Sequence, residues 1–157
     1  MNHYAKTAVF WPVMALILMA CAGTPQFSGV QGRDWDLVEI RTGEESVQFD
    51  RGQLEEEGFD DIFTLRFDAE RVNGIGAPNR FFAPYTLAEK QGITIKTIAA
   101  TLMASIREPE KLKERDYFVY LQNAVKWNIA GGSLELYSKT EDGSEIVLVF
   151  MDSGKKR

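Results

Sequence analysis

The stretch that decides the fold is Val72-Asn73-Gly74-Ile75-Gly76-Ala77-Pro78-Asn79-Arg80-Phe81-Phe82-Ala83-Pro84-Tyr85-Thr86-Leu87. Glycine and asparagine accept the backbone conformations of sharp turns, so residues 73–79 are predicted to fold back on themselves. The aromatic residues that follow carry the large apolar surface of a strand that is buried on one side. The stretch therefore predicts a tight polar loop that leads into an aromatic strand.

Other strands are predicted on both sides of this loop. Phe63-Thr64-Leu65-Arg66-Phe67 alternates between apolar and polar residues, as a half-buried strand does. Further strand-like runs are at residues 35–40, 126–129, 134–137 and 146–150. The last three are separated by Gly131-Gly132 and Asp142-Gly143, which are typical of hairpin turns.

One helix is predicted, from Pro109 to Val125. Apolar residues recur there at helical spacing, namely Tyr117, Phe118, Leu121, Ala124 and Val125. Many short strands and one late amphipathic helix predict an α+β fold, in which one face of an antiparallel sheet is buried against the helix. The pair Gly74-x-Gly76 does not predict a dinucleotide site, because position 79 is Asn and no helix pattern follows.

Two segments together resemble the signature of the META domain family, the family of the heat-shock protein HslJ. The first is Asn73-Gly74-x-Gly76-x-x-Asn79 followed by Tyr85, and the second is Ala100-Thr101-Leu102-Met103-Ala104-Ser105. The resemblance extends over residues 35–150. Family members often have cysteines in these motifs, but here Ala77-Pro78 precedes Asn79, and Ser105 ends the second motif.

The resemblance implies a strongly curved antiparallel β-sheet, or partial barrel, packed around one amphipathic helix. A complete barrel of the lipocalin type is the alternative. The motif residues that the resemblance singles out are Asn73, Gly74, Gly76, Asn79, Tyr85, Thr101 and Met103. We expect their role to be mainly structural, and the loop residues among them to act through backbone geometry.

The N-terminus has the features of a lipoprotein signal. An apolar run from Ala8 to Ala20 is shorter than the roughly 20 residues that a membrane-spanning helix needs. It ends at Leu18-Met19-Ala20-Cys21, which resembles the bacterial lipobox. We therefore expect cleavage between Ala20 and Cys21 and acylation of Cys21, which would anchor the protein in the membrane.

The sequence thus divides into four parts. We expect residues 1–20 to be a lipoprotein signal peptide and residues 21–33 to be the lipidated cysteine with a flexible tether. Residues 34–151 are predicted to form the META-like domain, and residues 152–157 a basic tail. Because Ala22 rather than Asp follows the cysteine, the expected location is the cell envelope, at the periplasmic face of the outer membrane.

Composition excludes several classes of function. The formal net charge is −5, and without a basic stripe the chain is a poor candidate for binding nucleic acid. The chain has one histidine, His3, and one cysteine, Cys21, and both lie outside the predicted domain. The domain therefore lacks the residues of a Ser-His-Asp or Cys-His centre and of a conventional zinc site. We expect no enzyme activity, cofactor or metal.

The resemblance implies a non-enzymatic binding or assembly module linked to envelope stress or integrity. One alternative is a pilotin-like or lipid-binding chaperone, and another is a hydrolase that uses the carboxylate pairs Asp60-Asp61 or Glu108 and Glu110. A glycan-binding domain would require Trp35 and Trp127 to be exposed.

A possible binding groove is predicted between the helix and the aromatic strand. Its walls would be Phe81, Phe82, Tyr85, Phe118 and Leu121. Large apolar side chains that stay partly exposed usually have a use, and the expected ligand is a hydrophobic peptide or a lipid tail.

Overall fold

The computed structural model describes residues 26–104, 109–140 and 142–154 of the 157-residue chain. The strands are β1 (Trp35–Thr42), β2 (Glu45–Gln48), β3 (Thr64–Phe67), β4 (Arg71–Ile75), β5 (Arg80–Ala88), β6 (Gly92–Ile95), β7 (Ala99–Ala100), β8 (Ala124–Ala130), β9 (Ser133–Lys139) and β10 (Glu145–Asp152). The helical elements are the 3₁₀ turn η1 (Phe27–Gly29), α1 (Arg51–Glu56) and α2 (Glu114–Gln122). The strands predicted at residues 35–40, 126–129, 134–137 and 146–150 are confirmed within β1, β8, β9 and β10.

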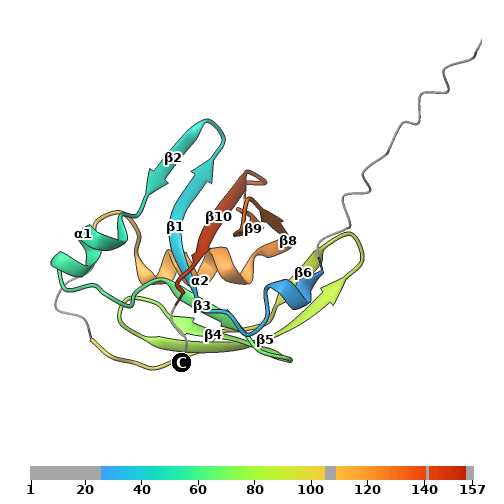
Figure 1. Ribbon diagram of the computed structural model, residues 1–157, viewed down its shortest axis with the longest axis horizontal. Coiled ribbons are helices and arrows are strands. Elements are labelled where there is room, and N and C mark those ends of the chain that lie inside the picture. Colours follow the sequence, from blue (N-terminus) through green and yellow to red (C-terminus); the bar gives the residue numbers. More distant parts are fainter. Residues whose placement is uncertain (1–25, 105–108, 141, 155–157) are drawn as a thin grey trace, which may run out of the picture.

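The strands close into an antiparallel barrel (Figure 1). Neighbouring strands follow the order β10-β9-β8-β6-β5-β4-β3-β1, and β10 returns to pair with β1. This closing ladder runs from Trp35 opposite Asp152 to Thr42 opposite Ile146. Two short strands lie outside the ring, since β2 forms a hairpin with β1, and β7 pairs with β5 beyond the end of β6.

The predicted partial barrel packed around one amphipathic helix is therefore wrong. The sheet closes on itself, and α2 is a short helix with only Tyr117 and Leu121 buried. The predicted helix from Pro109 to Val125 fails at both ends: α2 begins at Glu114, and the chain leaves the helix at Asn123 because Ala124 already pairs with β9. Local periodicity does not encode barrel closure, which joins the first and last strands of the domain.

Side chains from alternate strand positions fill the barrel, as expected for a barrel of eight strands. On β5, for example, Phe81, Ala83 and Tyr85 point inward and are buried, whereas Phe82 and Pro84 point outward. Figure 1 shows α2 and the N-terminal segment between the half of the sheet formed by β8, β9, β10 and β1 and the half formed by β3, β4 and β5.

The segment before β1 belongs to this core. The ring of Phe27 lies 5.1 Å from that of Phe67, 5.5 Å from that of Tyr85 and 4.9 Å from that of Trp127, measured between centroids. Val30 is fully buried and its carbonyl accepts a hydrogen bond from the indole nitrogen of Trp35. Residues 27–33 are thus part of the folded domain, in contrast to the flexible tether predicted for residues 21–33.

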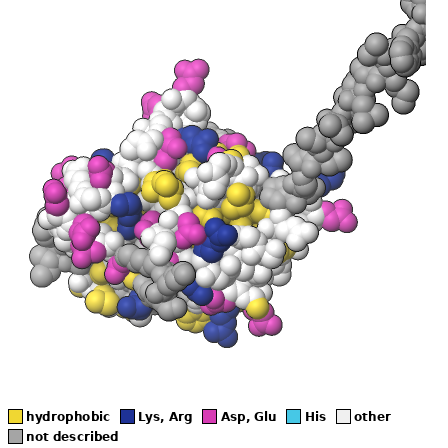
Figure 2. Space-filling model, viewed as in Figure 1, with side chains coloured by type: hydrophobic (Ala, Val, Ile, Leu, Met, Phe, Trp, Pro, Cys, Tyr) yellow, Lys and Arg dark blue, Asp and Glu magenta, His cyan; other side chains and the backbone are white. Residues whose placement is uncertain are grey.

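The surface is strongly acidic in places. Figure 2 shows carboxylates over α1 and at the tip of the β1–β2 hairpin. Within the described part of the chain, no helix is long and apolar enough to cross a membrane.

Candidate functional site

The turn between β4 and β5 holds the carboxylate of Glu114, the first residue of α2. The backbone nitrogens of Ala77 and Asn79 donate to its Oε1 at 2.6 and 2.7 Å, and Asn79 Nδ2 donates to its Oε2 at 2.7 Å. Hydrogen bonds to a carboxylate are about twice as strong as neutral ones. The start of the helix is therefore tied to the turn.

The same asparagine joins the turn to the segment that follows β7. Its Oδ1 accepts hydrogen bonds from Thr101 Oγ1 at 2.9 Å and from the backbone nitrogen of Met103 at 2.6 Å. Asn79 is buried, and both ends of its amide have partners. Asn79, Thr101, Met103 and Glu114 thus form one network, which we call the Glu114 network.

The two motif glycines make room for neighbouring atoms. A Cβ on Gly74 would lie 2.0 Å from the carbonyl oxygen of Thr64, and a Cβ on Gly76 would lie 2.5 Å from Glu114 Oε1. Neither glycine has a positive φ. The expected sharp fold over residues 73–79 is also shorter than predicted, because β4 continues to Ile75. Space rather than left-handed geometry explains these glycines.

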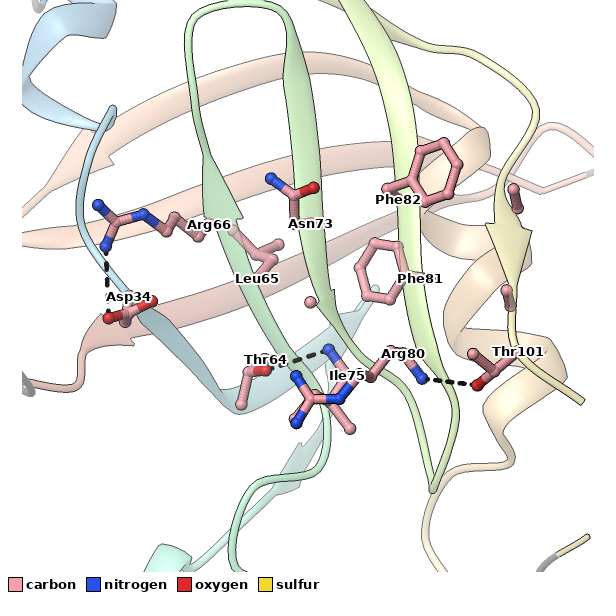
Figure 3. A pocket seen from close by; sticks show the side chains of 13 residues that line it. Asp34, Thr64, Leu65, Arg66, Asn73, Ile75, Arg80, Phe81, Phe82 and Thr101 are labelled. Atoms are coloured by element: carbon pink, nitrogen blue, oxygen red, sulfur yellow. Dashed lines mark hydrogen bonds and ion pairs between the residues drawn. The ribbon is translucent and has the colours of Figure 1, made fainter. Parts of the chain in front are cut away.

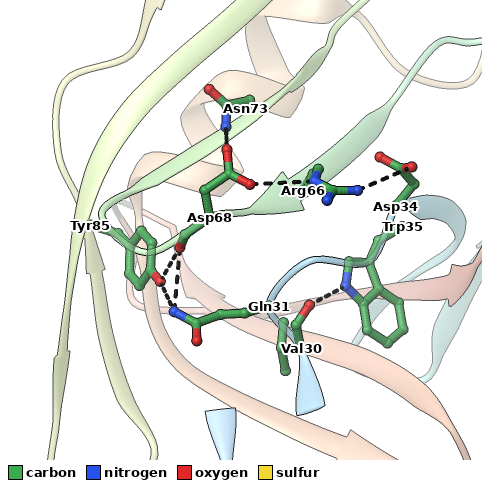
Figure 4. A network of polar contacts seen from close by, with 8 residues as sticks. All are labelled: Val30, Gln31, Asp34, Trp35, Arg66, Asp68, Asn73 and Tyr85. Carbon is green, nitrogen blue, oxygen red and sulfur yellow. Dashed lines mark hydrogen bonds and ion pairs between the residues drawn. The ribbon is translucent and has the colours of Figure 1, made fainter. Parts of the chain in front are cut away.

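The other two motif residues belong to a second network, drawn in Figure 4. Asn73 Nδ2 donates to Asp68 Oδ2 at 2.7 Å, and the hydroxyl of Tyr85 donates to the Asp68 carbonyl at 2.7 Å. Gln31 Nε2 donates to the Tyr85 hydroxyl at 2.8 Å, which ties the segment after η1 to the barrel. Burial raises the pKa of Tyr85, so the phenol stays protonated at neutral pH and can donate.

A pocket of about 420 Å³ opens beside the Glu114 network, between β3, β4, β5 and β7 (Figure 3). We call it the outer pocket. Its lining consists of Asp34, Thr64, Leu65, Arg66, Asn73, Gly74, Ile75, Arg80, Phe81, Phe82, Ala99, Ala100 and Thr101. Three motif residues, Asn73, Gly74 and Thr101, are therefore part of its wall.

The two arginines of the outer pocket differ in their partners. Arg66 forms ion pairs with Asp34 at 3.4 Å and with Asp68 at 3.3 Å. Arg80 forms no ion pair with any residue that the structure describes. Asp34 is the only acid in the lining, and Arg66 is paired both with it and with Asp68, so Arg80 is the cation of the lining that has no ion pair with a described residue.

The five residues of the predicted apolar groove lie apart. Phe81, Tyr85 and Leu121 are buried in the barrel, and Phe118 is partly buried with its ring 5.2 Å from that of Phe81. Phe82 points outward, and 47% of it is exposed. The side chains that would form the groove walls therefore belong mainly to the core, and only Phe81 and Phe82 line the outer pocket.

The remaining candidate residues are placed as follows. Trp35 and Trp127 are buried, so they offer no exposed platform for a glycan. Asp60, Asp61 and Glu110 are exposed, whereas Glu108, Ala20 and Cys21 lie outside the described residues. The described residues contain no group of three His, Cys, Asp or Glu side chains that could hold a metal ion.

Glu114 was not among the predicted site residues. Its partners on the turn are 35 and 37 positions earlier in the chain. The sequence contains no local signal for such a contact. Gln31 and Asp68 were missed for the same reason.

Comparison with known proteins gives a family and a fold. The family model described as META domain matches residues 28–152. None of the curated proteins compared with the chain matches it. A protein from Burkholderia xenovorans with an NMR structure is similar, with a TM-score of 0.59 and 13% identity over 99% of this chain and 100% of the other. A DUF4847 family protein from Bacteroides vulgatus has a TM-score of 0.56 and 12% identity over 83% of this chain and 99% of its own. At such identities these structures support the fold alone.

Proposed function

The chain belongs to the META domain family, and from this premise we propose that it is a non-enzymatic binding module of the cell envelope. In this proposal, acyl groups on Cys21 anchor the protein at the periplasmic face of the outer membrane. The outer pocket binds a ligand there, and this binding contributes to envelope integrity or to the response to envelope stress.

One observation carries the binding role. Asn79 bonds to Thr101, to Met103 and to Glu114, so the Glu114 network holds the turn, α2 and the segment after β7 in fixed positions. An accessible pocket lies directly beside this rigid network and shares Thr101 with it. A preorganised wall of this kind favours binding without a large ordering cost.

The envelope location is supported by the sequence before the barrel. The short apolar run ends in a lipobox-like sequence at Cys21, and the first described element, η1, begins six positions later at Phe27. Acylation at Cys21 would therefore hold the barrel close to a bilayer.

The binding role is tested by filling the outer pocket. Ala99 is exposed and lines the pocket, so Ala99→Trp would occupy its volume without changing the core. The matched control is Ala130→Trp, at an exposed position near the end of β8. We expect a strain that lacks the gene to lose resistance to detergent stress, and the control variant but not Ala99→Trp to restore it. Full restoration by Ala99→Trp at normal protein levels would contradict a role for the pocket.

A second candidate function is the capture of a hydrophobic peptide or lipid tail, as in a pilotin-like or lipid-binding chaperone. It is favoured by the two apolar side chains of Leu102 and Met103, which are 101% and 59% exposed. If this function is correct, Leu102→Asp will abolish restoration in the same strain, whereas Ala99→Trp will leave it intact.

A further inference from the structure

We infer that the outer pocket selects a small organic anion, namely a carboxylate or phosphate carried on a flat apolar body. Arg80 would bind the anionic group, and the ring of Phe82 would contact the apolar body. This inference rests on the proposed function and adds the chemical class of the ligand.

Arg80 supplies the cation, at the end of the pocket that faces the β4–β5 turn. Arg80 is opposite Ile75 in the ladder between β4 and β5, and Ile75 is opposite Thr64 on β3. Figure 3 shows the guanidinium of Arg80 on this side, at the other end of the pocket from Phe82. Because Arg80 is exposed and has no ion pair among the described residues, its donors are available to a ligand. A guanidinium presents a planar fork that matches carboxylate and phosphate groups.

The remaining surface of the pocket is mostly apolar. Leu65, Ile75, Phe81, Phe82, Ala99 and Ala100 supply it. Phe82 is the one large ring of the lining that is about half exposed, and the guanidinium carbon of Arg71 lies 5.7 Å from its centroid. This cation–π contact helps to hold the ring in place beside the pocket. A flat apolar body would gain contact area against such a ring.

Charge and size narrow the ligand further. The chain as a whole carries a formal net charge of −5, yet the pocket lining contains two arginines and one aspartate. Because Arg66 is paired with two carboxylates, Arg80 supplies the positive charge that favours anions and disfavours cations. A volume of about 420 Å³ is at the lower end of the range for small-molecule sites, which suits one or two rings with a single anionic group.

The test is an NMR titration of the full chain, ¹⁵N-labelled and purified in a non-ionic detergent. The probes are benzoate and phenyl phosphate, with neutral benzyl alcohol and inorganic phosphate as comparisons. We expect benzoate and phenyl phosphate to shift the amide signals of residues 73–75, 80–82 and 99–101 saturably. Benzyl alcohol and inorganic phosphate should each bind at least tenfold more weakly, because each supplies only half of the recognised structure.

The charge requirement is tested by Arg80→Gln, which keeps a polar side chain but removes the cation. The matched control is Arg115→Gln, at an exposed position on α2 away from the pocket lining. We expect Arg80→Gln to weaken phenyl phosphate binding at least tenfold and Arg115→Gln to leave it unchanged, with the other amide signals of both variants undisturbed. Equal binding of benzyl alcohol, or equal binding to Arg80→Gln, would overturn the inference.

The inference and the proposed function can fail separately. If no probe binds but Ala99→Trp still removes detergent resistance, the ligand class is wrong and the role of the pocket stands. If phenyl phosphate binds as expected but Ala99→Trp restores resistance fully, the anion site is correct and the proposed function is wrong.

Discussion

Asn79 Nδ2 and Glu114 Oε2 lie 2.7 Å apart, although 35 positions separate the two residues in the chain. This contact connects the β4–β5 turn to the first residue of α2. The other Glu114 oxygen, Oε1, accepts hydrogen bonds from two backbone nitrogens of the turn. The carboxylate thus provides the acceptor that a neighbouring strand would otherwise provide. The stability of the turn is therefore predicted to depend on a single side chain from the helix.

Removal of that carboxylate is predicted to destabilise the protein. Glu114→Ala leaves the nitrogens of Ala77 and Asn79 without their acceptor, at a cost of about 3 kcal/mol in the free energy of unfolding. Asp116→Ala is the matched control, since Asp116 also lies in the first turn of α2 and is exposed. Chemical denaturation measures both, and equal losses would mean that only the helix dipole matters.

Substitution of Gly74 is predicted to be more damaging than its backbone conformation implies. In Gly74→Ala the new Cβ meets the Thr64 carbonyl at 2.0 Å, so the β3–β4 ladder must shift. We expect a loss of about 3 kcal/mol in unfolding free energy. Gly29→Ala is the control, because nothing lies within 4 Å of its Cβ position. A thermal unfolding midpoint for Gly74→Ala equal to that of the control would refute the steric explanation.

Phe27 is predicted to be a core residue in solution. Phe27→Ala removes a ring that packs against Phe67, Tyr85 and Trp127, and we expect a loss of about 3–4 kcal/mol. Gln26→Ala, at the exposed neighbouring position, should have almost no effect on the unfolding midpoint. Similar unfolding midpoints for the two variants would mean that residues 27–33 are not part of the core and belong to the flexible tether.

Acid is predicted to weaken the barrel through Glu135. Burial raises the pKa of this carboxyl, but hydrogen bonds from Tyr137, Arg41 and Asn128 outweigh burial and leave the pKa below its ordinary value. A pKa that is lower in the folded state contributes stability above the unfolded value of about 4.5, and this stability is lost as the pH falls through the folded value.

The corresponding variant is Glu135→Gln. We expect it to be less stable than the unmodified protein at pH 7, and the difference to shrink as the pH falls below about 4.5. Glu145→Gln, at an exposed position on β10, serves as the control. Urea denaturation at several pH values measures the difference, and a gap for Glu135→Gln that is constant with pH would rule out this carboxylate as the cause.

Cys21 is predicted to be the site of acylation. Cys21→Ser removes the thiol that would carry the acyl groups, so incorporation of labelled palmitate should stop and the protein should leave the acylated membrane fraction. Ala22→Ser keeps the cysteine and should be labelled normally. Undiminished labelling of Cys21→Ser would show that Cys21 is not the acylated residue.

Local features of the fold were predictable from the sequence, and long-range contacts were not. The alternation from Leu134 to Tyr137 and the Asp142-Gly143 turn depend on neighbouring residues, and Gly143 has the expected positive φ of 86°. The closure of β1 on β10 and the position of Glu114 depend on residues far apart in the chain. No short pattern identifies such pairs, so the complete barrel was only the alternative prediction, and the contacts of Glu114 were not predicted.

The candidate site was also predicted only in part from the sequence. The family motif identified Asn73, Gly74 and Thr101, which line the outer pocket, but gave no reason to choose Arg80. The prediction of an apolar groove was wrong because successive side chains on a barrel strand point to opposite faces of the sheet. Phe81 and Tyr85 face the interior, and Phe82 faces the solvent.

The position of η1 in the core limits how far the protein can reach. Only residues 22–26 separate Cys21 from Phe27, and even a fully extended chain of this length spans only about 20 Å. With Cys21 acylated as proposed, the barrel would therefore stay next to the bilayer. A small anion would then have to diffuse to the bilayer surface to reach the outer pocket.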